Sequence, residues 1–367
     1  MSTNQNKYSK HNYFMSLALQ QAMKSLGNTE MNPSVGCVIV KNNTLIGAGS
    51  TGFKGTPHAE VNAISFSKNT VKDSELYTTL EPCSNYGKTP PCVSKIINSK
   101  IKKVFFSIND PDSRSFKKSK RVFEKNNIYV KKNINANEIH FFYKSYIKSK
   151  EKSLPFVTAK LALSNDFFTV NKKKKWITNK YSRGRVHLLR SFHDSILTSA
   201  TTIIEDNPKL TCRINGLEHT SPTRIILDKN LKVPLNYNVV STAKKNKTII
   251  FFDCNNIKRI NKMRSLGVKL VRIPCNQYNT FDLEDVLKKI KFLGFSRIFL
   301  ESGLKLTEAF LANSLIDEFH LFITKNKLKL NGKKSFKKSM KILNKSKKIL
   351  NNKVNLLGDT LLSFRLK

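Results

Sequence analysis

The sequence places one histidine, one glutamate and two cysteines in an order that strongly restricts how the chain can fold around them. His58-Ala59-Glu60 is followed by Pro82-Cys83 and, after a longer spacer, by Cys92. One imidazole and two thiolates make a three-ligand zinc site that leaves the fourth tetrahedral position for water. We therefore expect His58, Cys83 and Cys92 to bind Zn²⁺. We expect Glu60 to be the catalytic residue that moves protons, as in hydrolytic deamination.

Each part of this pattern has an ordinary alternative explanation. An isolated H-A-E triplet is common in helices, where the histidine is usually just partly buried, and cysteines can be buried apolar residues. The occurrence of all parts in order favours the metal site. The local patterns agree, because a helix is expected from Glu60 and a strand over 75–80 delivers Cys83 to a loop. A further apolar helix is expected over 93–97.

Three segments of the first half carry a resemblance to a known family. They are residues 32–40, residues 57–61 and the stretch from Thr79 to Cys92. They resemble the bifunctional deaminase-reductases of riboflavin biosynthesis, and the insert Gly87-Lys88-Thr89-Pro90-Pro91 between the cysteines is the most specific mark. Base deaminases of other kinds usually have a close C-x-x-C pair. The resemblance implies deamination of a phosphoribosylated diaminopyrimidine, with substrate contacts at Asn32 and Lys88.

Length and hydrophobic patterning predict two α/β domains. The 367 residues suffice for two cores. A charged stretch over 148–152 precedes Leu154-Pro155, so we expect domains at 1–150 and 151–367. The first is predicted to be an α/β/α sandwich, which the resemblance identifies as cytidine-deaminase-like. For the second, the resemblance implies a dihydrofolate-reductase-like α/β domain that uses NADPH to reduce the ribose of the deaminated pyrimidine.

The expected elements follow the apolar runs of the sequence. In the first domain they are a helix within the first 26 residues and strands over 35–40, 45–49, 75–80, 103–108 and 128–130. In the second domain they are strands over 156–162, 196–198, 224–228, 248–252, 297–300 and 361–366, with helices over 288–292 and 306–312.

The second domain lacks the G-x-G-x-x-G sequence of a standard dinucleotide site. It has Glu301-Ser302-Gly303 between a strand and a helix, where backbone N–H groups can hold phosphate, although an ordinary turn looks the same. The resemblance implies NADPH contacts at Ala162, Trp176, Thr202, Asp206, Gly303, Leu304, Lys305, Leu306, Thr307, Glu308 and Ala309. It implies substrate contacts at Arg190, Leu210, Arg213 and Glu301.

Other roles remain open for several of these side chains. Guanidinium groups bind phosphate bidentately, which suits Arg190 and Arg213, but either could be a surface ion-pair residue. Trp176, the only tryptophan, could belong to the core. Lys88 could be an ordinary solvated lysine.

The sequence also departs from the family pattern. A glycine of the family is Phe167 here, and a small polar residue is Lys174. We expect the Phe167 ring to obstruct the cofactor unless its loop has moved, and Lys174 to attract the cofactor's phosphates. In the deaminase half, two histidines of the family are Thr51 and Asn85, and a glycine-rich stretch is Lys117-Lys118-Ser119-Lys120. Substrate affinity is therefore expected to be more affected than the zinc chemistry.

Net charge is the strongest argument for a different function. A formal charge of +41 and a pI near 10.1 are typical of nucleic-acid-binding proteins. The lysines are spread along almost every segment, however, without a dedicated basic arm. We therefore favour a small phosphorylated pyrimidine as substrate and no specific nucleic-acid partner. The alternatives are a basic base deaminase of the tRNA type and a deaminase with a decayed reductase half.

Other features of the sequence bear on location and assembly. The absence of an apolar run of about 18 residues and of a signal peptide argues against membrane insertion and secretion. The six cysteines have no scaffold-like spacing, so we expect reduced thiols and a cytoplasmic enzyme. A homo-oligomer is compatible with the sequence, which does not determine the oligomeric state.

Overall fold

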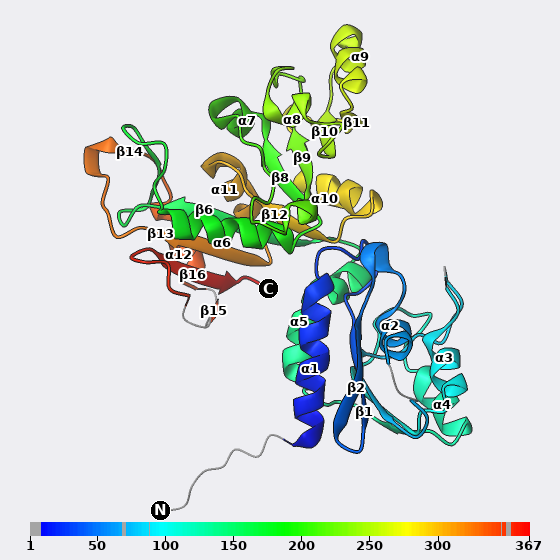
Figure 1. Cartoon of the computed structure of the whole chain (residues 1–367). Coiled ribbons are helices and arrows are strands. Elements are labelled where there is room, and N and C mark those ends of the chain that lie inside the picture. Colours follow the sequence, from blue (N-terminus) through cyan, green and yellow to red (C-terminus); the bar gives the residue numbers. More distant parts are fainter. Residues whose placement is uncertain (1–8, 68–70, 88, 346, 350–353) are drawn as a thin grey trace, which may run out of the picture. The chain divides into compact units, whose positions relative to one another are not determined.

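The computed structural model describes residues 9–367 apart from 68–70, 88, 346 and 350–353 (Figure 1). The chain divides into two compact units, Met1–Ser153 and Leu154–Lys367, each of which is described by itself. Among the described residues, no helix combines the length and the apolar character needed to cross a membrane.

A mixed five-stranded sheet forms the centre of the first unit. Its strands are β1 (Gly36–Lys41), β2 (Thr44–Ser50), β3 (Glu75–Leu80), β4 (Lys103–Ile108) and β5 (Tyr129–Lys131). They lie in the order β2-β1-β3-β4-β5, in which β1 is antiparallel to β2 and β3. The strands β3, β4 and β5 run parallel to one another. The loops that leave β3 and β4 therefore start at the same edge of the sheet.

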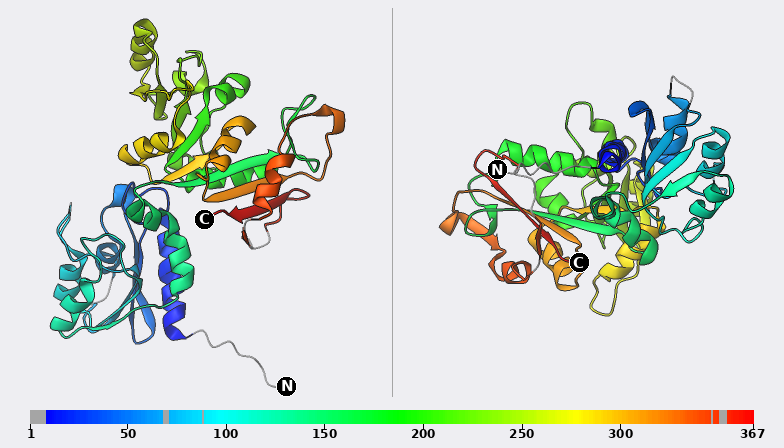
Figure 2. Two further views of the ribbon diagram at one scale, coloured as in Figure 1. Left: turned by 180° about the vertical axis from the view of Figure 1, so that it is seen from behind. Right: turned by 90° about the horizontal axis from the view of Figure 1, so that it is seen from below.

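Helices cover both faces of this sheet (Figures 1 and 2). One face carries α1 (Lys10–Ser25) and α5 (Ala136–Glu151), and the other carries α2 (Ala59–Ser65), α3 (Cys92–Asn98) and α4 (Ser119–Lys125), while a short 3-10 turn spans Phe53–Gly55. The buried residues of α1 recur at helical spacing, as Phe14, Ala18 and Ala22 show. The first unit is an α/β/α sandwich, so the predicted fold class is confirmed.

The charged stretch at 148–152, near which the sequence predicts the domain boundary, is largely helical. It is the last turn of α5, where Ser149 is buried and the Lys150 ammonium donates to Asp112. The alternation of buried and charged positions is that of an amphipathic helix end, and the division of the chain falls after Ser153.

A nine-stranded sheet runs through the second unit. Its strands are β6 (Phe156–Leu163), β8 (Ser195–Ser199), β9 (Thr223–Leu227), β10 (Thr248–Phe252), β11 (Lys269–Arg272), β12 (Arg297–Leu300), β13 (Glu318–Ile323), β15 (Lys347–Ile349) and β16 (Thr360–Arg365). The order is β11-β10-β9-β8-β12-β6-β13-β16-β15. Neighbours from β11 to β13 are parallel, and β16 is antiparallel to β13 and β15. A separate ribbon pairs β7 (Phe168–Asn171) with β14 (Gly332–Ser335).

Two apolar clusters fill the two faces of the large sheet. One cluster includes residues of α6 (Lys180–Ser191), α7 (Ala200–Asp206), α8 (Asn238–Ser241) and α9 (Ile257–Ser265). The other includes residues of α10 (Leu283–Phe292), α11 (Leu304–Ala312) and α12 (Lys337–Leu343). Short 3-10 turns span Glu218–Thr220 and Lys329–Asn331. Successive residues of β10 alternate between the clusters, with Ile249 in one and Ile250 in the other, which explains its continuous apolar run.

Candidate functional site

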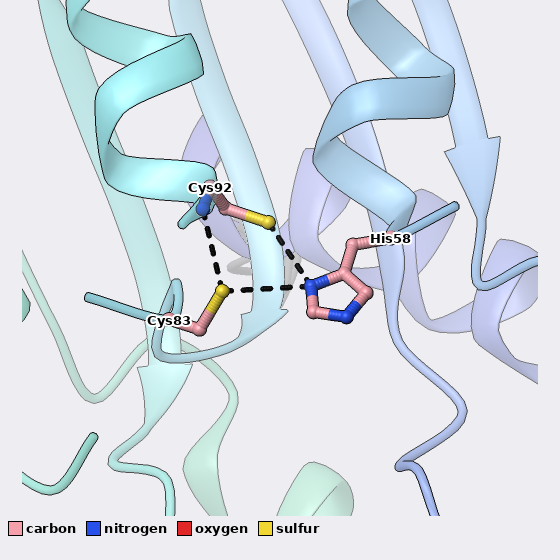
Figure 3. A group of neighbouring side chains, drawn as sticks. All are labelled: His58, Cys83 and Cys92. Carbon is pink, nitrogen blue, oxygen red and sulfur yellow. Dashed lines mark hydrogen bonds between the residues drawn. The ribbon is translucent and has the colours of Figure 1, made fainter. Parts of the chain in front are cut away.

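Three side chains from separate segments of the first unit converge near the ends of two helices (Figure 3). His58 is the N-cap residue of α2, Cys83 lies in the loop after β3, and Cys92 is the first residue of α3. Their ligand atoms all lie within 4.8 Å of one another. The structure thus brings together the three residues predicted as metal ligands.

The separations between these atoms fit a tetrahedral metal ion. His58 Nδ1 lies 3.2 Å from Cys92 Sγ and 3.5 Å from Cys83 Sγ. Zinc bonds of about 2.3 Å to sulfur and about 2.0 Å to nitrogen imply N···S edges of roughly 3.5 Å in a tetrahedron. The backbone N–H of Cys92 donates to Cys83 Sγ at 3.3 Å, which favours a thiolate there. One histidine and two cysteines are therefore a suitable ligand set for Zn²⁺.

Hydrogen bonds within the cluster set its charges. The hydrogen bond from the Cys92 thiol holds the pKa of Cys83 well below its usual range, and the contact with His58 acts in the same direction. The same bond to Cys83, together with burial, raises the pKa of the Cys92 thiol. The hydrogen bond with Cys83 also raises the pKa of His58. One thiolate is thus stabilised by the fold itself.

Glu60 lies beside the three ligands without belonging to their set. It occupies the first turn of α2 and is 3% exposed. Its Oε2 lies 3.4 Å from Cys92 Sγ. Burial raises the pKa of Glu60, and the charge of Cys83 adds to this effect. A buried carboxyl group at this place can exchange a proton with a water molecule that occupies the fourth coordination position of a metal ion bound by His58, Cys83 and Cys92.

A cavity of about 370 Å³ opens beside the cluster and is lined by His58, Glu60 and Cys83. Asn32, predicted to contact substrate, also lines it, and its Nδ2 donates to the Gly55 carbonyl at 3.0 Å. Lys88, the other predicted substrate contact of this unit, lies outside the described residues.

The two positions where the family has histidine both line this cavity. The Thr51 hydroxyl accepts the backbone N–H of Val35 at 2.8 Å, so this side chain is used to hold the backbone. Asn85 Oδ1 accepts the hydroxyl of Ser115 at 2.6 Å. The Asn85 amide is thereby oriented by the loop that follows β4.

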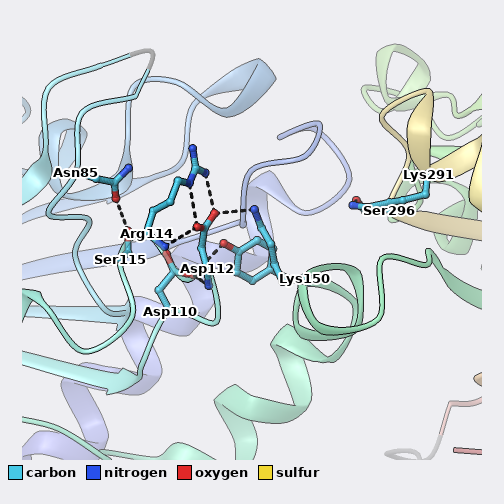
Figure 4. A network of polar contacts seen from close by, with 9 residues as sticks. Asn85, Asp110, Asp112, Arg114, Ser115, Lys150, Lys291 and Ser296 are labelled. Carbon is cyan, nitrogen blue, oxygen red and sulfur yellow. Dashed lines mark hydrogen bonds and ion pairs between the residues drawn. The ribbon is translucent and has the colours of Figure 1, made fainter.

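A network of charges that the sequence did not reveal borders the same cavity (Figure 4). Asp112 accepts two hydrogen bonds from Arg114, at 2.9 Å to Nε and 2.7 Å to Nη2, and one from Lys150 Nζ at 2.7 Å. The bonds from Arg114 in particular hold the pKa of Asp112 well below its usual range. Asp110 adds a second carboxyl group, whose Oδ1 accepts the backbone N–H of Asp112 at 3.0 Å and the Tyr146 hydroxyl at 2.9 Å. The Asp110-Pro111-Asp112 sequence after β4 is the only sign of this network in the sequence. Lys150, which binds Asp112 from α5, is remote from it in the chain.

Glu81 fixes the loop that carries this network. Its carboxylate is buried and accepts the backbone N–H groups of Asp110 at 3.2 Å, Lys117 at 3.0 Å and Ser119 at 3.1 Å. The Ser119 hydroxyl adds a fourth bond at 2.9 Å. Lys117 has φ +56°, a left-handed conformation that favours glycine, at one of the positions where the family is glycine-rich. The loop therefore has a left-handed turn without a glycine at that place.

In the second unit, Glu301 follows β12 and meets two cations. Arg190 of α6 donates through Nε to Oε2 at 2.9 Å and through Nη2 to Oε1 at 3.0 Å. Lys160 Nζ of the neighbouring strand β6 lies 3.7 Å from Oε1. Burial disfavours ionisation, but the charges of Arg190 and Lys160 outweigh it and lower the pKa of Glu301 to about 2. Sequence reasoning missed Lys160, because its place depends on the pairing of β6 with β12.

The surroundings of Glu301 carry more positive than negative charge. Arg190 also donates through Nη1 to the Thr211 carbonyl at 2.8 Å, so each of its three nitrogens has an acceptor in the protein. Arg213 is exposed, and its backbone N–H donates to His187 Nδ1 at 3.3 Å. Burial, Arg190 and Arg213 lower the pKa of His187 to about 4, so this imidazole is neutral at pH 7. Arg213 is thus the arginine with an accessible guanidinium.

The start of α11 is held against α7. Gly303 is its N-cap residue, and the Gly303 N–H donates to Thr202 Oγ1 at 3.0 Å. The Thr202 hydroxyl also contacts Ser302 Oγ at 3.3 Å. Of the other predicted cofactor contacts on α11, Leu304 and Thr307 are buried and Lys305 is exposed. Partly exposed positions there are Leu306, Glu308 and Ala309.

The remaining predicted contacts lie on other elements of the second unit. Trp176 is 55% exposed and is therefore not a core residue. The guanidinium of Arg183 lies 5.1 Å from the centroid of its ring. Asp206 ends α7 and is exposed, and Ala162 on β6 is paired with Phe322 of β13. Leu210 is buried with φ +55°.

Phe167 has the left-handed backbone that its replacement of a family glycine requires, with φ +67°. Its ring is partly buried and packs against the apolar cluster of α10 to α12. The ring therefore contributes to packing in this structure, and its expected obstruction of the cofactor stays a prediction. Lys174, the other substituted position of this unit, is exposed.

Two protein families match separate parts of the chain. The RibD C-terminal domain matches residues 155–325, and the cytidine and deoxycytidylate deaminase zinc-binding region matches residues 8–108. The riboflavin biosynthesis protein RibD of Bacillus amyloliquefaciens is 33% identical over 312 residues, 84% of this chain and 83% of that protein. RibD of Aquifex aeolicus is 34% identical over 312 residues, 84% of this chain and 85% of that protein.

Solved structures extend this similarity over nearly the whole chain. RibD of Acinetobacter baumannii is similar with a TM-score of 0.83 at 26% identity, covering 97% of this chain and 98% of that one. A Thermotoga maritima protein is described as a diaminohydroxyphosphoribosylaminopyrimidine deaminase/5-amino-6-(5-phosphoribosylamino)uracil reductase. It has a TM-score of 0.83 at 27% identity, with 97% of this chain and 98% of that one covered.

Proposed function

The chain belongs to the RibD family of riboflavin-biosynthesis proteins, and on this premise we propose that its two sites act in succession on one phosphoribosylated pyrimidine. The chain is a bifunctional enzyme, a zinc-dependent deaminase and an NADPH-dependent reductase. In the proposal, the first unit hydrolyses the ring amine of a diaminopyrimidine ribotide. The second unit then reduces the ribosyl side chain of the product to a ribityl chain.

The convergence of His58, Cys83 and Cys92 beside Glu60 carries the proposal for the first unit. When bound, zinc supplies a water molecule whose pKa is lowered to about 7. The three ligands hold the ion, and the Cys92 N–H stabilises the Cys83 thiolate. Glu60 accepts a proton from the attacking water at a carboxylate oxygen and donates it to the leaving amine. Asn32 and the Asn85 amide line the space for the pyrimidine and its ribose.

We place the 5′-phosphate of the ribotide beside Arg114, which lines the cavity. Asp112 orients Arg114 through two of its nitrogens, and the third nitrogen points away from Asp112 (Figure 4). Lys150 binds the same carboxylate at 2.7 Å and so neutralises it together with Arg114. A guanidinium fixed in this way can donate to a phosphate with little further loss of side-chain entropy. Lys88 is proposed as a second contact to substrate from the loop between the cysteines.

The proposal for the second unit rests on Glu301 and its cations. When bound, NADPH supplies the hydride for the reduction. Glu301, as a permanent anion, orients Arg190 and Lys160, and the Lys160 ammonium is the donor that can bind an oxygen of the sugar. Leu210 is proposed to contact the substrate, and the exposed Arg213 to bind its phosphate. The proposed NADPH contacts are Ala162, Trp176, Thr202, Asp206 and the segment Gly303, Leu304, Lys305, Leu306, Thr307, Glu308 and Ala309.

The two steps are tested by incubating purified protein with the diaminopyrimidine ribotide and analysing the products by mass spectrometry. Without NADPH, we expect ammonia release and the deaminated ribotide alone. With NADPH, we expect the same product to gain two hydrogens, with matching oxidation of the cofactor. Deamination of tRNA or single-stranded DNA without turnover of the ribotide would contradict the proposal. Absence of NADPH binding would show that the second unit has lost its activity.

We also propose that the enzyme is cytoplasmic and has no specific nucleic-acid partner. All six cysteines are free, which is the usual state in a reducing compartment. The spread of lysines over the chain supports a generally basic surface more than a dedicated binding face. A filter-binding measurement at physiological salt, with tRNA as probe, tests this part of the proposal.

A further inference from the structure

Arg224 of β9 is a buried arginine that forms no ion pair among the residues that the structure describes. It is 1% exposed, and its nitrogens donate only to neutral oxygens. The acceptors are the carbonyls of Lys209, Asn238, Val239 and Asn246 and the hydroxyls of Thr242 and Thr248. Burial lowers the pKa of Arg224 to about 10, so the group is still charged at neutral pH.

A buried charge without a counterion is unfavourable unless its hydrogen-bonding groups are satisfied. Here the six acceptors come from β10, from α8 with the turn after it, and from the segment that follows α7. The guanidinium therefore ties three separate parts of the chain to one point. Of these, only the segment after α7 carries residues that we place in the reductase site, since Lys209 lies between Asp206 and Leu210.

The segment 207–211 has a backbone that its own residues do not favour. Asn207 has φ +40° and Leu210 has φ +55°, and the left-handed region is unfavourable for a leucine. Asn207 is fixed by Asn238, whose backbone N–H and Nδ2 donate to its side-chain and backbone oxygens, both at 2.8 Å. At the other end, Arg190 donates to the Thr211 carbonyl at 2.8 Å. External hydrogen bonds thus maintain the conformation of this segment.

We infer that Arg224 is a positioning residue of the reductase, which holds the segment 207–211 so that Asp206 and Leu210 meet the cofactor and the substrate. The inference rests on the proposed roles of these two residues. Arg224 itself contacts neither the cofactor nor the substrate in this proposal. It contributes to activity by fixing the conformation of the segment 207–211, since small displacements of binding groups reduce activity strongly.

The test is steady-state kinetics of full-length Arg224→Met, with both activities measured on the same protein. We expect the KM for NADPH or for the deaminated ribotide to rise on the order of tenfold, with a smaller change in kcat. Deamination in the first unit should equal that of the wild type. Asn238→Ala removes the Nδ2 donor to the Asn207 carbonyl but keeps the backbone N–H donor, and a smaller rise of the same KM is expected.

Val286→Ala, in the apolar cluster on the opposite face of the sheet, is the control for simple loss of stability. Its KM values should stay at the wild-type level although its thermal unfolding midpoint falls. Unchanged KM values in folded Arg224→Met, or an equal rise in Val286→Ala, would overturn the inference. If Arg224→Met does not fold, Arg224→Lys decides, because it keeps the charge but loses most of the donors, and unchanged KM values there would also overturn the inference. Failure of the wild type to oxidise NADPH would instead contradict the proposed function of the second unit, and the inference with it.

Discussion

Glu60 of the first site and Glu301 of the second are both largely removed from solvent, and the neighbours of the two carboxyl groups give them opposite pKa shifts. Glu60 lies beside a thiolate in an enclosed place, and both burial and that charge raise its pKa. Glu301 is also enclosed, but Arg190 and Lys160 lower its pKa to about 2. A raised pKa suits a group that takes up and releases a proton, whereas a lowered one suits a permanent anion. The partners of a buried carboxyl group, more than burial itself, decide its use.

Of the changes that test this comparison, the substitution of Glu60, proposed to carry a proton, is expected to reduce activity most. Glu60→Gln keeps the shape and polarity of the side chain but cannot carry a proton. We expect deamination to fall by about three orders of magnitude. Ammonia release measures this, while zinc content and reductase turnover should match the wild type. Loss of zinc from the variant would show that Glu60 supports the metal site, contrary to the role proposed.

If Glu301 acts as a permanent anion, Glu301→Gln should reduce the reductase activity and leave the deaminase activity unchanged. Glu301→Gln removes the carboxylate that orients Arg190 and Lys160, so we expect reductase kcat/KM to fall by about 10²-fold, as a small misplacement of binding groups can cause. Deaminase kinetics should not change. Glu284→Gln, which removes the partner of Lys288 in an exposed pair, is the matched control and should have little effect. Equal loss in both variants would refute the assignment.

The low pKa of Glu301 also predicts how stability depends on pH. Its value of about 2 in the folded protein lies below the ordinary 4.5, so ionised Glu301 stabilises the fold fully above about pH 4.5. This contribution is lost as the pH falls from about 4.5 to 2. Relative to Glu301→Gln, we expect the wild type to lose on the order of 3 kcal/mol of unfolding free energy across this window. Denaturant unfolding of both proteins measures it, and parallel curves would contradict it.

Arg114 provides a test of how the first site selects its substrate. Arg114→Ala should raise the deaminase KM for the ribotide by about tenfold, because one charged hydrogen bond to phosphate is lost. The KM for the corresponding unphosphorylated riboside should not change. Arg121→Ala, an exposed arginine of α4, is the matched control. A similar rise for the riboside would place Arg114 away from the phosphate.

Phe167 is expected to have the smallest effect. Phe167→Gly relieves the left-handed backbone but removes a partly buried ring, so we expect a net destabilisation of about 1 kcal/mol. Because the ring packs against the core, the KM for NADPH should stay within about twofold of the wild type. Thermal unfolding and steady-state kinetics measure the two quantities. A marked fall in the KM would show that the ring does obstruct the cofactor.

The sequence was most informative where chemistry and local structure coincide. His58, Glu60, Cys83 and Cys92 lie at starts of helices and after a strand, so their order in the chain already indicated a site. Arg114 and Lys160 were not found, because their roles depend on partners that only the fold brings near. Lys150 is 38 residues from Asp112, and Glu301 is 141 residues from Lys160.

The secondary structure shows the same limit. The continuous apolar run over 248–252 correctly predicted the strand β10, because every residue in this strand is buried. By contrast, β13 and α5 were not predicted. The strand β13 includes His320, and α5 mixes aromatic residues with lysines. In both elements the buried positions became clear only when the packing partners were known.

The loop shaped by Glu81 has a consequence for how this chain can change in evolution. Its contour is imposed by a carboxylate outside the loop, through bonds to backbone N–H groups that any residue except proline can offer. Side chains of this loop that make no contact of their own can then change while the path of the backbone persists. Lysines can therefore stand in place of glycines there, as Lys117 does, without a change in the backbone that borders the cavity.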